Sequence, residues 1–272
     1  MSRASYFAVR PPAGAELPAP ELPPRMEWLN VAMLRMDQLV RRSCVLVEFF
    51  DTARINSLRT LDYVRAWHER YGDRGLRVIG VHSPAYSFGR ERAVVERAVE
   101  RLGIEYAVLL DPAFEVWRLY GNQGWPARYL FARGGLLRHM HYGEGEYADS
   151  ERAIQETLLE LDPGLELPQP LAPLRAEDAD GALLEPQTPE VALPADRERL
   201  ELAGDWTDGG DYIEAAAAGA SAAVEFTAGG AWAVLSGTVE PGLHETGGTV
   251  TAAQGGPRLP DFPPAPLAPP TL

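Results

Sequence analysis

The stretch that most constrains the fold runs from Val45 to Trp67 and reads VLVEFFDTARINSLRTLDYVRAW. A hydrophobic run over residues 45–50 is typical of a strand buried on both faces, and the pattern that follows the polar DTAR predicts an amphipathic helix. A strand leading into a helix is half of a βαβ unit. In open α/β sheets the crevice at the carboxyl end of such a strand usually holds the functional site. We therefore expect residues 51–57 to lie at that site.

This segment resembles the active-site strand and helix of the TlpA/DipZ-type thioredoxin-like proteins, which are related to the AhpC/TSA proteins. Members carry a Cys-Ile-Asn-Cys box, then Leu-Arg-Thr-Leu and a proline. Here the box reads Arg54, Ile55, Asn56, Ser57, and Asp62 stands at the position of the proline. The resemblance covers residues 15–165. It rests further on EWLN at 27–30, GVHSP at 80–84, YGNQGWPARYLF at 120–131 and HYGEGEY at 141–147.

The order of the predicted elements fits this resemblance. Periodicity alone predicts a three-layer α/β sandwich. The resemblance implies a thioredoxin-like three-layer α/β/α sandwich with an inserted strand and helix. The predicted strands are 45–50, 76–82, 105–110, 128–132 and 136–142. The predicted helices lie after the box, at 91–102, briefly through Trp117, and from Asp149 or Ser150 onward.

Proline and glycine divide the chain into five parts. We predict a disordered lead-in at 1–24, the thioredoxin-like domain at 25–161, a proline-rich linker at 162–174, a small β-rich domain at 175–255 and a disordered tail at 256–272. The linker is expected to keep neighbouring domains apart. Short apolar runs between glycine turns, such as RLELAGDW and DYIEAA, predict five antiparallel strands after it. DipZ-type proteins carry a β-sandwich there, so the resemblance implies a truncated sandwich.

The distribution of charge argues against nucleic acid as a partner. Residues 1–160 hold 21 arginines and 21 acidic residues, whereas residues 161–272 hold 4 and 18, so the net charge of −14 lies in the C-terminal part. Phosphate binding requires a clustered basic face. The N-terminal sequence is interrupted by prolines, and no apolar run suits a signal peptide or a membrane span. We expect a cytoplasmic protein with no membrane partner.

The only cysteine, Cys44, excludes an intrachain disulfide and a cysteine-rich metal site. At the start of an apolar strand it is expected to be a small buried hydrophobic residue. In the box, Arg54 and Ser57 cannot carry out disulfide exchange, because that reaction needs a thiolate at the helix N-terminus and a second thiol one turn later. The usual two-thiol route is therefore excluded.

Other polar residues give only weak indications of hydrolysis, metal binding or proton transfer. His82, His139 and His141 are candidate bases for Ser57, but no Asp-His-Ser order stands out, and hydrolysis is not favoured. His139 and His141 alternate on a predicted strand, and without a third ligand nearby we expect a packed or solvated pair and no metal. Glu48 occupies the position of an acidic residue that assists proton transfer in the family; if buried, it should have a raised pKa. We predict no cofactor.

Peptide binding in a groove is the alternative to thiol chemistry. Pro126 resembles the cis-proline that faces the active-site helix in thioredoxin-like folds, where its loop pairs with an extended peptide. Trp125, Phe50 and Tyr86 are expected either to line this groove or to be plain core. Arg54 is expected either to hold an anion or a partner's carboxylate, or to point into water. Asp62 should remove the helix kink of the family's proline.

These observations favour a degenerate, redox-inactive thioredoxin-like protein that binds a protein or peptide, or acts as a scaffold, and is not an enzyme. The alternative is a thiol-disulfide oxidoreductase or peroxiredoxin-like antioxidant with residual activity through Cys44 or a partner's thiol. A third hypothesis is carbohydrate binding by the C-terminal part, where Trp206, Tyr212 and Trp232 could stack on sugars.

Overall fold

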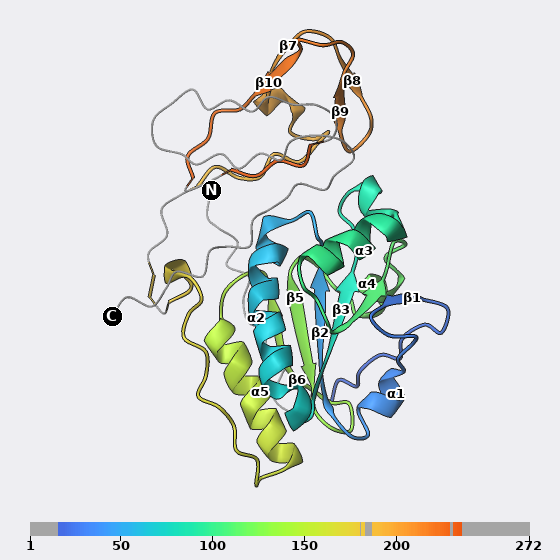
Figure 1. Ribbon diagram of the computed structural model, residues 1–272, viewed down its shortest axis with the longest axis vertical. Helices are drawn as coiled ribbons and strands as arrows, with labels where there is room; N and C mark the ends of the chain where they lie inside the picture. The colour runs from blue at the N-terminus through green and yellow to red at the C-terminus, as the bar shows by residue number, and fades with distance from the viewer. Residues whose placement is uncertain (1–15, 180, 183–186, 229–230, 236–272) are drawn as a thin grey trace. The chain divides into compact units, whose positions relative to one another are not determined.

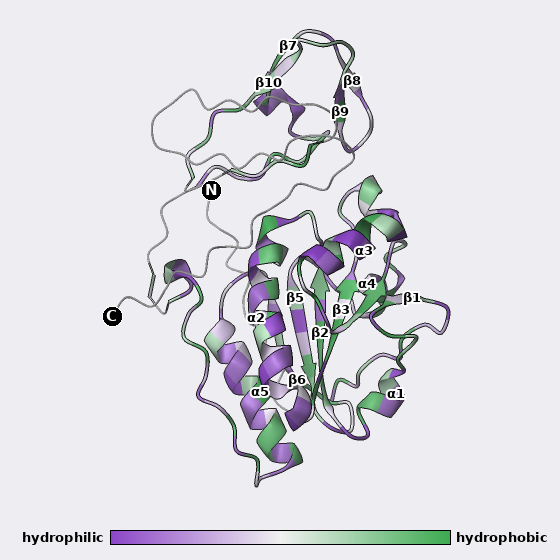
Figure 2. Ribbon diagram, in the orientation of Figure 1, coloured by the Kyte–Doolittle hydropathy of each residue, from purple (hydrophilic) through white to green (hydrophobic). Residues whose placement is uncertain are grey.

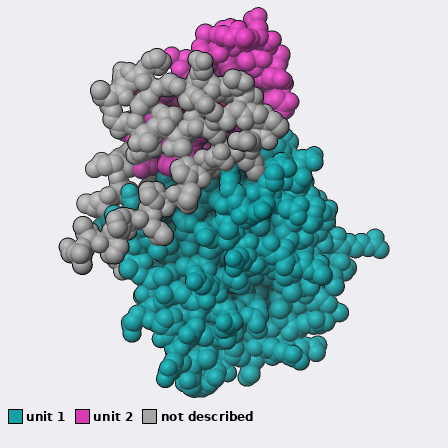
Figure 3. Space-filling view, in the orientation of Figure 1, with its two compact units in different colours: residues 1–182, 264–272 teal, residues 183–263 magenta. Residues whose placement is uncertain are grey.

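The computed structural model describes residues 16–179, 181–182, 187–228 and 231–235. The chain divides into two compact units: residues 1–182 with 264–272 form unit 1, and residues 183–263 form unit 2 (Figure 3). The predicted tail at 256–272 falls entirely outside the described residues, as do residues 1–15 of the predicted lead-in. The described residues of the lead-in, 16–24, are ordered, because Pro18 forms a bridge with Leu136 and Leu22 is buried in the core; the prediction of disorder is wrong for them.

Unit 1 is built on a six-stranded mixed sheet with the strand order β1-β4-β3-β2-β5-β6 (Figure 1). The strands β2, β3 and β4 are parallel, and β1, β5 and β6 pair antiparallel with their neighbours. The strands are β1 (Glu27–Leu29), β2 (Cys44–Phe50), β3 (Leu76–His82), β4 (Ala107–Leu110), β5 (Ala127–Phe131) and β6 (Leu137–Tyr142). The sheet and its helices form the three-layer α/β sandwich expected from the sequence.

In the part of the chain that the structure describes, five α-helices cover the two faces of this sheet. They are α1 (Met36–Leu39), α2 (Ile55–Tyr71), α3 (Arg92–Arg101), α4 (Glu115–Leu119) and α5 (Tyr147–Leu161). Apolar side chains of α2, α3 and α5 share one core cluster, and those of α1 and α4 share the other. Within the described ranges, none of the helices is long and apolar enough to cross a membrane.

Strand β2 supplies side chains to both clusters by simple alternation. Leu46 and Phe50 belong to the cluster under α2, and Val47 and Phe49 belong to the opposite one. Every residue of β2 is buried, as expected for a strand with helices on both faces. Hydrophobic colour accordingly gathers on the central strands in Figure 2.

Helix α2 extends without a break through Asp62, as expected once the family's proline is absent. Its inward side chains include Leu61, Val64 and Trp67, all essentially buried. A short 3₁₀ turn follows at Gly72–Arg74, and Gly75 then adopts the left-handed conformation with φ 106°. This positive φ is the reason for glycine at residue 75, because side chains with a Cβ rarely adopt it.

The segment after α5 does not leave the domain. Residues 165–178, which we name the strap, lie against α2 and α5, with Leu165, Leu167 and Leu171 packed on the core cluster. The strap ends in a 3₁₀ turn at Ala176–Asp178. Most of the predicted linker 162–174 is therefore part of the surface of unit 1, because its leucines bury against the helices and its backbone finds side-chain partners there.

Unit 2 has only short strands in its described residues. Two antiparallel ribbons form, one from β7 (Glu201–Ala203) with β10 (Ser221–Ala223), the other from β8 (Trp206–Asp208) with β9 (Ile213–Ala215). The predicted strand RLELAGDW is thus divided at Gly204, and AWAVLSG forms no strand in its described residues. GTVTAA lies outside the described residues. No described residue of this unit is fully buried, so the described residues do not make up the truncated sandwich.

The central sheet carries one acidic side chain whose titration should affect stability. Glu48 on β2 is fully buried and pairs in register with Arg128 on β5. Burial raises the pKa of Glu48 to about 8, and Arg128 offsets this only in part. Because the folded pKa exceeds the unfolded one, the folded state holds the proton more tightly, and stability should fall as pH rises from about 4.5 to about 8.

We predict that Glu48→Gln removes this pH dependence. Between pH 5 and pH 8 the wild type should lose up to about 1.4 kcal/mol per pH unit relative to the variant, measured as the free energy of unfolding in urea. Asp149→Asn, at an exposed carboxylate of α5, is the control. Parallel curves for the wild type and Glu48→Gln would contradict the prediction.

Candidate functional site

The degenerate box forms the start of α2, at the carboxyl end of β2. Arg54 is the N-cap residue and has an extended backbone, and no side chain caps the helix there. Ser57 lies within the first turn and is fully buried, whereas Asn56 is half-buried. The structure therefore places the long side chain of the box at its partly exposed end and the small one in the interior.

The loop at Trp125 and Pro126 lies against this turn. The peptide bond between these two residues is cis. The Asn56 side-chain amide donates a hydrogen bond of 2.8 Å to the Trp125 carbonyl, and its oxygen accepts the Ser57 N–H at 2.8 Å. The Arg54 guanidinium carbon lies 4.8 Å from the centre of the Trp125 ring, within the range of a cation–π contact.

Besides Arg54, two aromatic rings pack against the Trp125 side chain. Trp117 lies with its ring centre 4.4 Å away and Phe114 at 6.1 Å. The Trp125 indole N–H donates to the Ser83 carbonyl at 2.8 Å, which fixes the ring against the loop after β3. Tyr86, further along that loop, is half-buried and stacks on Phe88.

The prediction that Phe50 lines the groove needs correction. Phe50 is fully buried, and its ring packs edge-on against His82, with the centres 5.4 Å apart. It is the last residue of β2 and its side chain points to the core under α2, because alternation along the strand sends it there. Among the predicted groove residues, Arg54, Trp125 and Pro126 come together and Phe50 does not.

The box has no geometry for nucleophilic catalysis. The Ser57 hydroxyl accepts the Asp51 N–H at 3.2 Å, while the His82 ring contacts Thr52 and Asp51. No contact joins His82 to Ser57 among the described residues. Burial alone would raise the pKa of Asp51, but His82 and the backbone amides of Ala53 and Ala85 hold it below its ordinary value. Asp51 therefore organises the loops around the box as a buried carboxylate.

Cys44 lies at the other end of β2 from the box. Its side chain is fully buried, and its thiol donates a weak hydrogen bond to the Thr157 carbonyl at 3.4 Å. Burial raises the pKa of the Cys44 thiol to about 11, so it is a poor nucleophile at neutral pH. Six residues of extended chain separate Cys44 from Phe50, roughly 20 Å.

The two histidines of β6 bond to neighbouring protein groups. His139 contacts the Ser150 hydroxyl at 3.1 Å, and His141 donates to the Glu144 carbonyl at 3.2 Å. Burial lowers the pKa of His141 to about 3, with Arg128 adding to the effect, so its ring is neutral. Within the described residues, no group of three or more His, Cys, Asp or Glu side chains could hold a metal ion.

Sequence reasoning missed two contributions to this site. The side-chain amide of Asn56 bonds the box to the Trp125 carbonyl, and no sequence pattern distinguishes Asn56 from the other residues of the box. The loop 143–146 also contacts the site: its Gly143 N–H donates to the Pro126 carbonyl at 2.7 Å. The HYGEGEY motif was a signal for this loop, but only as part of a family resemblance.

Comparison with known proteins gives the following relatives. No family model matches the chain. The DipZ proteins of Mycobacterium bovis and Mycobacterium tuberculosis are each 36% identical over 172 residues, which are 62% of this chain and 25% of DipZ. The thiol-disulfide oxidoreductase YkuV of Bacillus subtilis is 24% identical over 145 residues, 53% of this chain and 97% of YkuV. A solved oxidized thioredoxin-like protein is 23% identical, covers 53% of this chain and 97% of its own, and has a TM-score of 0.49.

The chain thus spans about a quarter of the length of the DipZ proteins and nearly all of YkuV. The chain contains a thioredoxin-like domain related to DipZ and to thiol-disulfide oxidoreductases, and its single cysteine fits the absence of a Cys-x-x-Cys box.

Proposed function

We propose that the thioredoxin-like domain is a redox-inactive module that binds an extended peptide segment of a partner protein along the Trp125–Pro126 loop. The observation that carries the proposal is a backbone N–H left available on a loop that is otherwise fixed. Its Trp125 N–H has no partner among the described residues, whereas the surrounding groups of the loop are held in place by hydrogen bonds.

A preorganised backbone edge suits peptide binding. Three bonds fix the loop: Asn56 to the Trp125 carbonyl, the Trp125 indole to the Ser83 carbonyl, and Gly143 to the Pro126 carbonyl. An extended peptide gains affinity from main-chain hydrogen bonds to such an edge, and a rigid edge loses little conformational entropy on binding. Neither effect requires a thiol.

The side chains around the edge suit the same role. Arg54, stacked on Trp125, presents a planar guanidinium on an aromatic ring, and Arg and Trp are the residues most enriched at energetically dominant positions of protein interfaces. A carboxylate of the partner would be the favoured neighbour of Arg54. The partner would therefore be an extended segment that carries an acidic residue.

The alternative function, residual oxidoreductase activity, has less physical support. It needs a reactive thiol at the mouth of the sheet, but the Cys44 thiol is buried, has a raised pKa and lies at the far end of β2. Activity through a thiol of a partner would still leave the box without a resolving group.

Restoring both thiols should restore redox chemistry. We predict that Arg54→Cys/Ser57→Cys forms a disulfide across the first turn of α2 and reduces insulin in the presence of dithiothreitol, because position 57 is buried and takes a small side chain. The wild type and the single variant Arg54→Cys should show no turnover. Wild-type turnover that disappears in Cys44→Ala would favour the alternative function instead.

Peptide binding can be tested by selecting a phage-displayed library of short random peptides on the full chain. We predict that enriched peptides share an acidic residue and bind the wild type in calorimetry. Trp125→Ala should weaken their binding at least tenfold and Arg54→Ala about as much, because both side chains line the edge. Trp206→Ala, a tryptophan of unit 2, is the matched control. A library that yields no binder, or binders unaffected by Trp125→Ala, would overturn the proposal.

A further inference from the structure

Side chains of unit 1 form hydrogen bonds with backbone groups at several points along the strap. At its start, the Glu166 carbonyl accepts from Arg74 at 3.2 Å. In its middle, the Pro168 carbonyl accepts from Gln155 at 2.8 Å, and the Leu171 N–H donates to the buried carboxylate of Glu151 at 2.9 Å. These bonds join the strap to α5 and to the 3₁₀ turn that follows α2, so the strap is bonded to unit 1 as a regular element would be.

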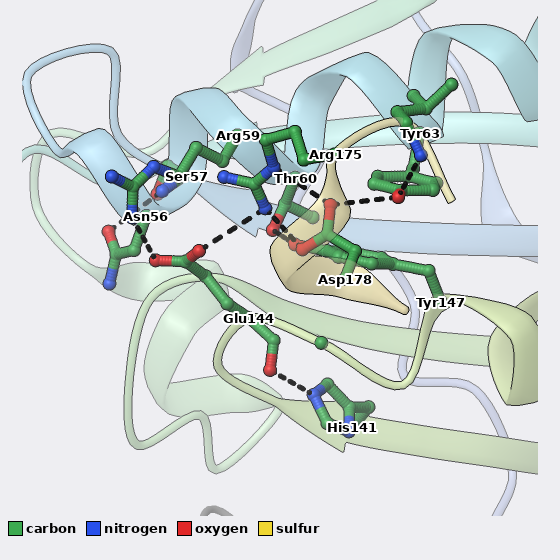
Figure 4. Close-up of polar contacts among 12 residues, drawn as sticks. Asn56, Ser57, Arg59, Thr60, Tyr63, His141, Glu144, Tyr147, Arg175 and Asp178 are labelled. Atoms are coloured by element: carbon green, nitrogen blue, oxygen red, sulfur yellow. Dashed lines mark hydrogen bonds and ion pairs between the residues drawn. The ribbon is translucent and has the colours of Figure 1, made fainter. Parts of the chain in front are cut away.

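Near its end the strap meets the side of α2 at Tyr63. The Tyr63 hydroxyl accepts the Leu174 N–H at 2.7 Å and donates to the Asp178 carboxylate at 2.9 Å. The Tyr63 ring stacks on Tyr147, with the centres 3.7 Å apart. Asp178 also receives two hydrogen bonds from Arg175, at 2.8 and 2.7 Å. Figure 4 shows these side chains converging beside α2.

One carboxylate connects this end of the strap to the candidate site. Glu144 lies between two guanidinium groups, with Arg59 of α2 at 3.5 Å and Arg175 of the strap at 3.6 Å (Figure 4). All three side chains are about a quarter to a third exposed. Solvent screens charges less at such positions than on an open surface. Glu144 thereby joins the strap to the second turn of α2.

Glu144 belongs to the loop that supports the cis-proline. In this loop Gly143, Gly145 and Glu146 all have positive φ, at 86°, 90° and 48°. The Gly143 N–H donates to the Pro126 carbonyl at 2.7 Å, and the Gly145 carbonyl accepts from Arg128 at 2.7 Å. A loop with a non-glycine residue in the left-handed region persists only where its surroundings fix it.

We infer that the strap is a latch that fixes the Trp125–Pro126 edge, with Arg175 and Glu144 as its positioning residues. The path consists of two contacts. Arg175 holds the Glu144 carboxylate, and the adjacent Gly143 holds the Pro126 carbonyl from behind the edge. The purpose of the latch rests on the proposed peptide-binding function. The coupling of the strap to the Trp125–Pro126 edge rests only on the two contacts just named.

Hydrogen exchange of single amides, followed by NMR on the full chain, tests the coupling. In Arg175→Ala the amides of Leu174 and Gly143 should exchange about tenfold faster, because each bond loses the contact that holds its segment. The amide of Val47 in the central strand should keep its rate. Tyr63→Phe keeps the stacked ring but removes the acceptor of the Leu174 amide, and it should accelerate both amides as well.

The control is Arg152→Ala, which breaks an exposed ion pair with Asp149 on α5. It should change neither amide. An unchanged Gly143 rate in both Arg175→Ala and Tyr63→Phe would overturn the latch, even if Leu174 exchanged faster. Affinity for a selected peptide separates the two proposals. If Gly143 responds but no peptide binds the wild type, the latch stands and the peptide-binding function fails.

Discussion

The burial of β2 on both faces is the constraint on which the rest of unit 1 depends. Its alternating side chains feed two separate core clusters, so the strand cannot shift by one residue without exchanging them. The fixed register places the box at the carboxyl end of the strand. It also sets β5 beside β2, and the Trp125–Pro126 loop immediately before β5 is thereby brought against the first turn of α2.

This constraint explains how far the sequence could predict the fold. Strands β2 and β3 and helices α2 and α3 have strong periodicity, and their predicted ends agree with the structure to within a few residues. The strand order needed the family resemblance, because periodicity does not specify which strands are neighbours. The same resemblance brought Arg54 and Trp125 together, two residues separated by some 70 positions. For Phe50 the sequence left two expectations, groove or plain core, and the structure shows core, because alternation along β2 turns this side chain to the cluster under α2.

The strap shows where sequence reasoning fails for a physical reason. Proline-rich composition indicates an extended chain, but it does not distinguish an extended chain in solvent from one lying on a surface. The difference comes from partners distant in sequence, such as Glu151 and Tyr63, which satisfy backbone groups of Leu171 and Leu174. Three leucines within seven residues were a signal, because they bury when a hydrophobic surface is near. Unit 2 offers no such signal in its described residues, where no side chain is fully buried.

The two substitutions in the box are compatible with the fold for opposite reasons. Position 57 is fully enclosed, and serine fits there because it is nearly the size of cysteine and its hydroxyl finds the Asp51 N–H. Position 54 is partly exposed, and arginine fits because its guanidinium extends over Trp125. The scaffold therefore does not need sulfur at either position. Without thiols at these positions the two-thiol route of disulfide exchange is excluded, whereas the hydrogen bonds that fix the Trp125–Pro126 edge involve no sulfur, so the binding that we propose does not depend on redox chemistry.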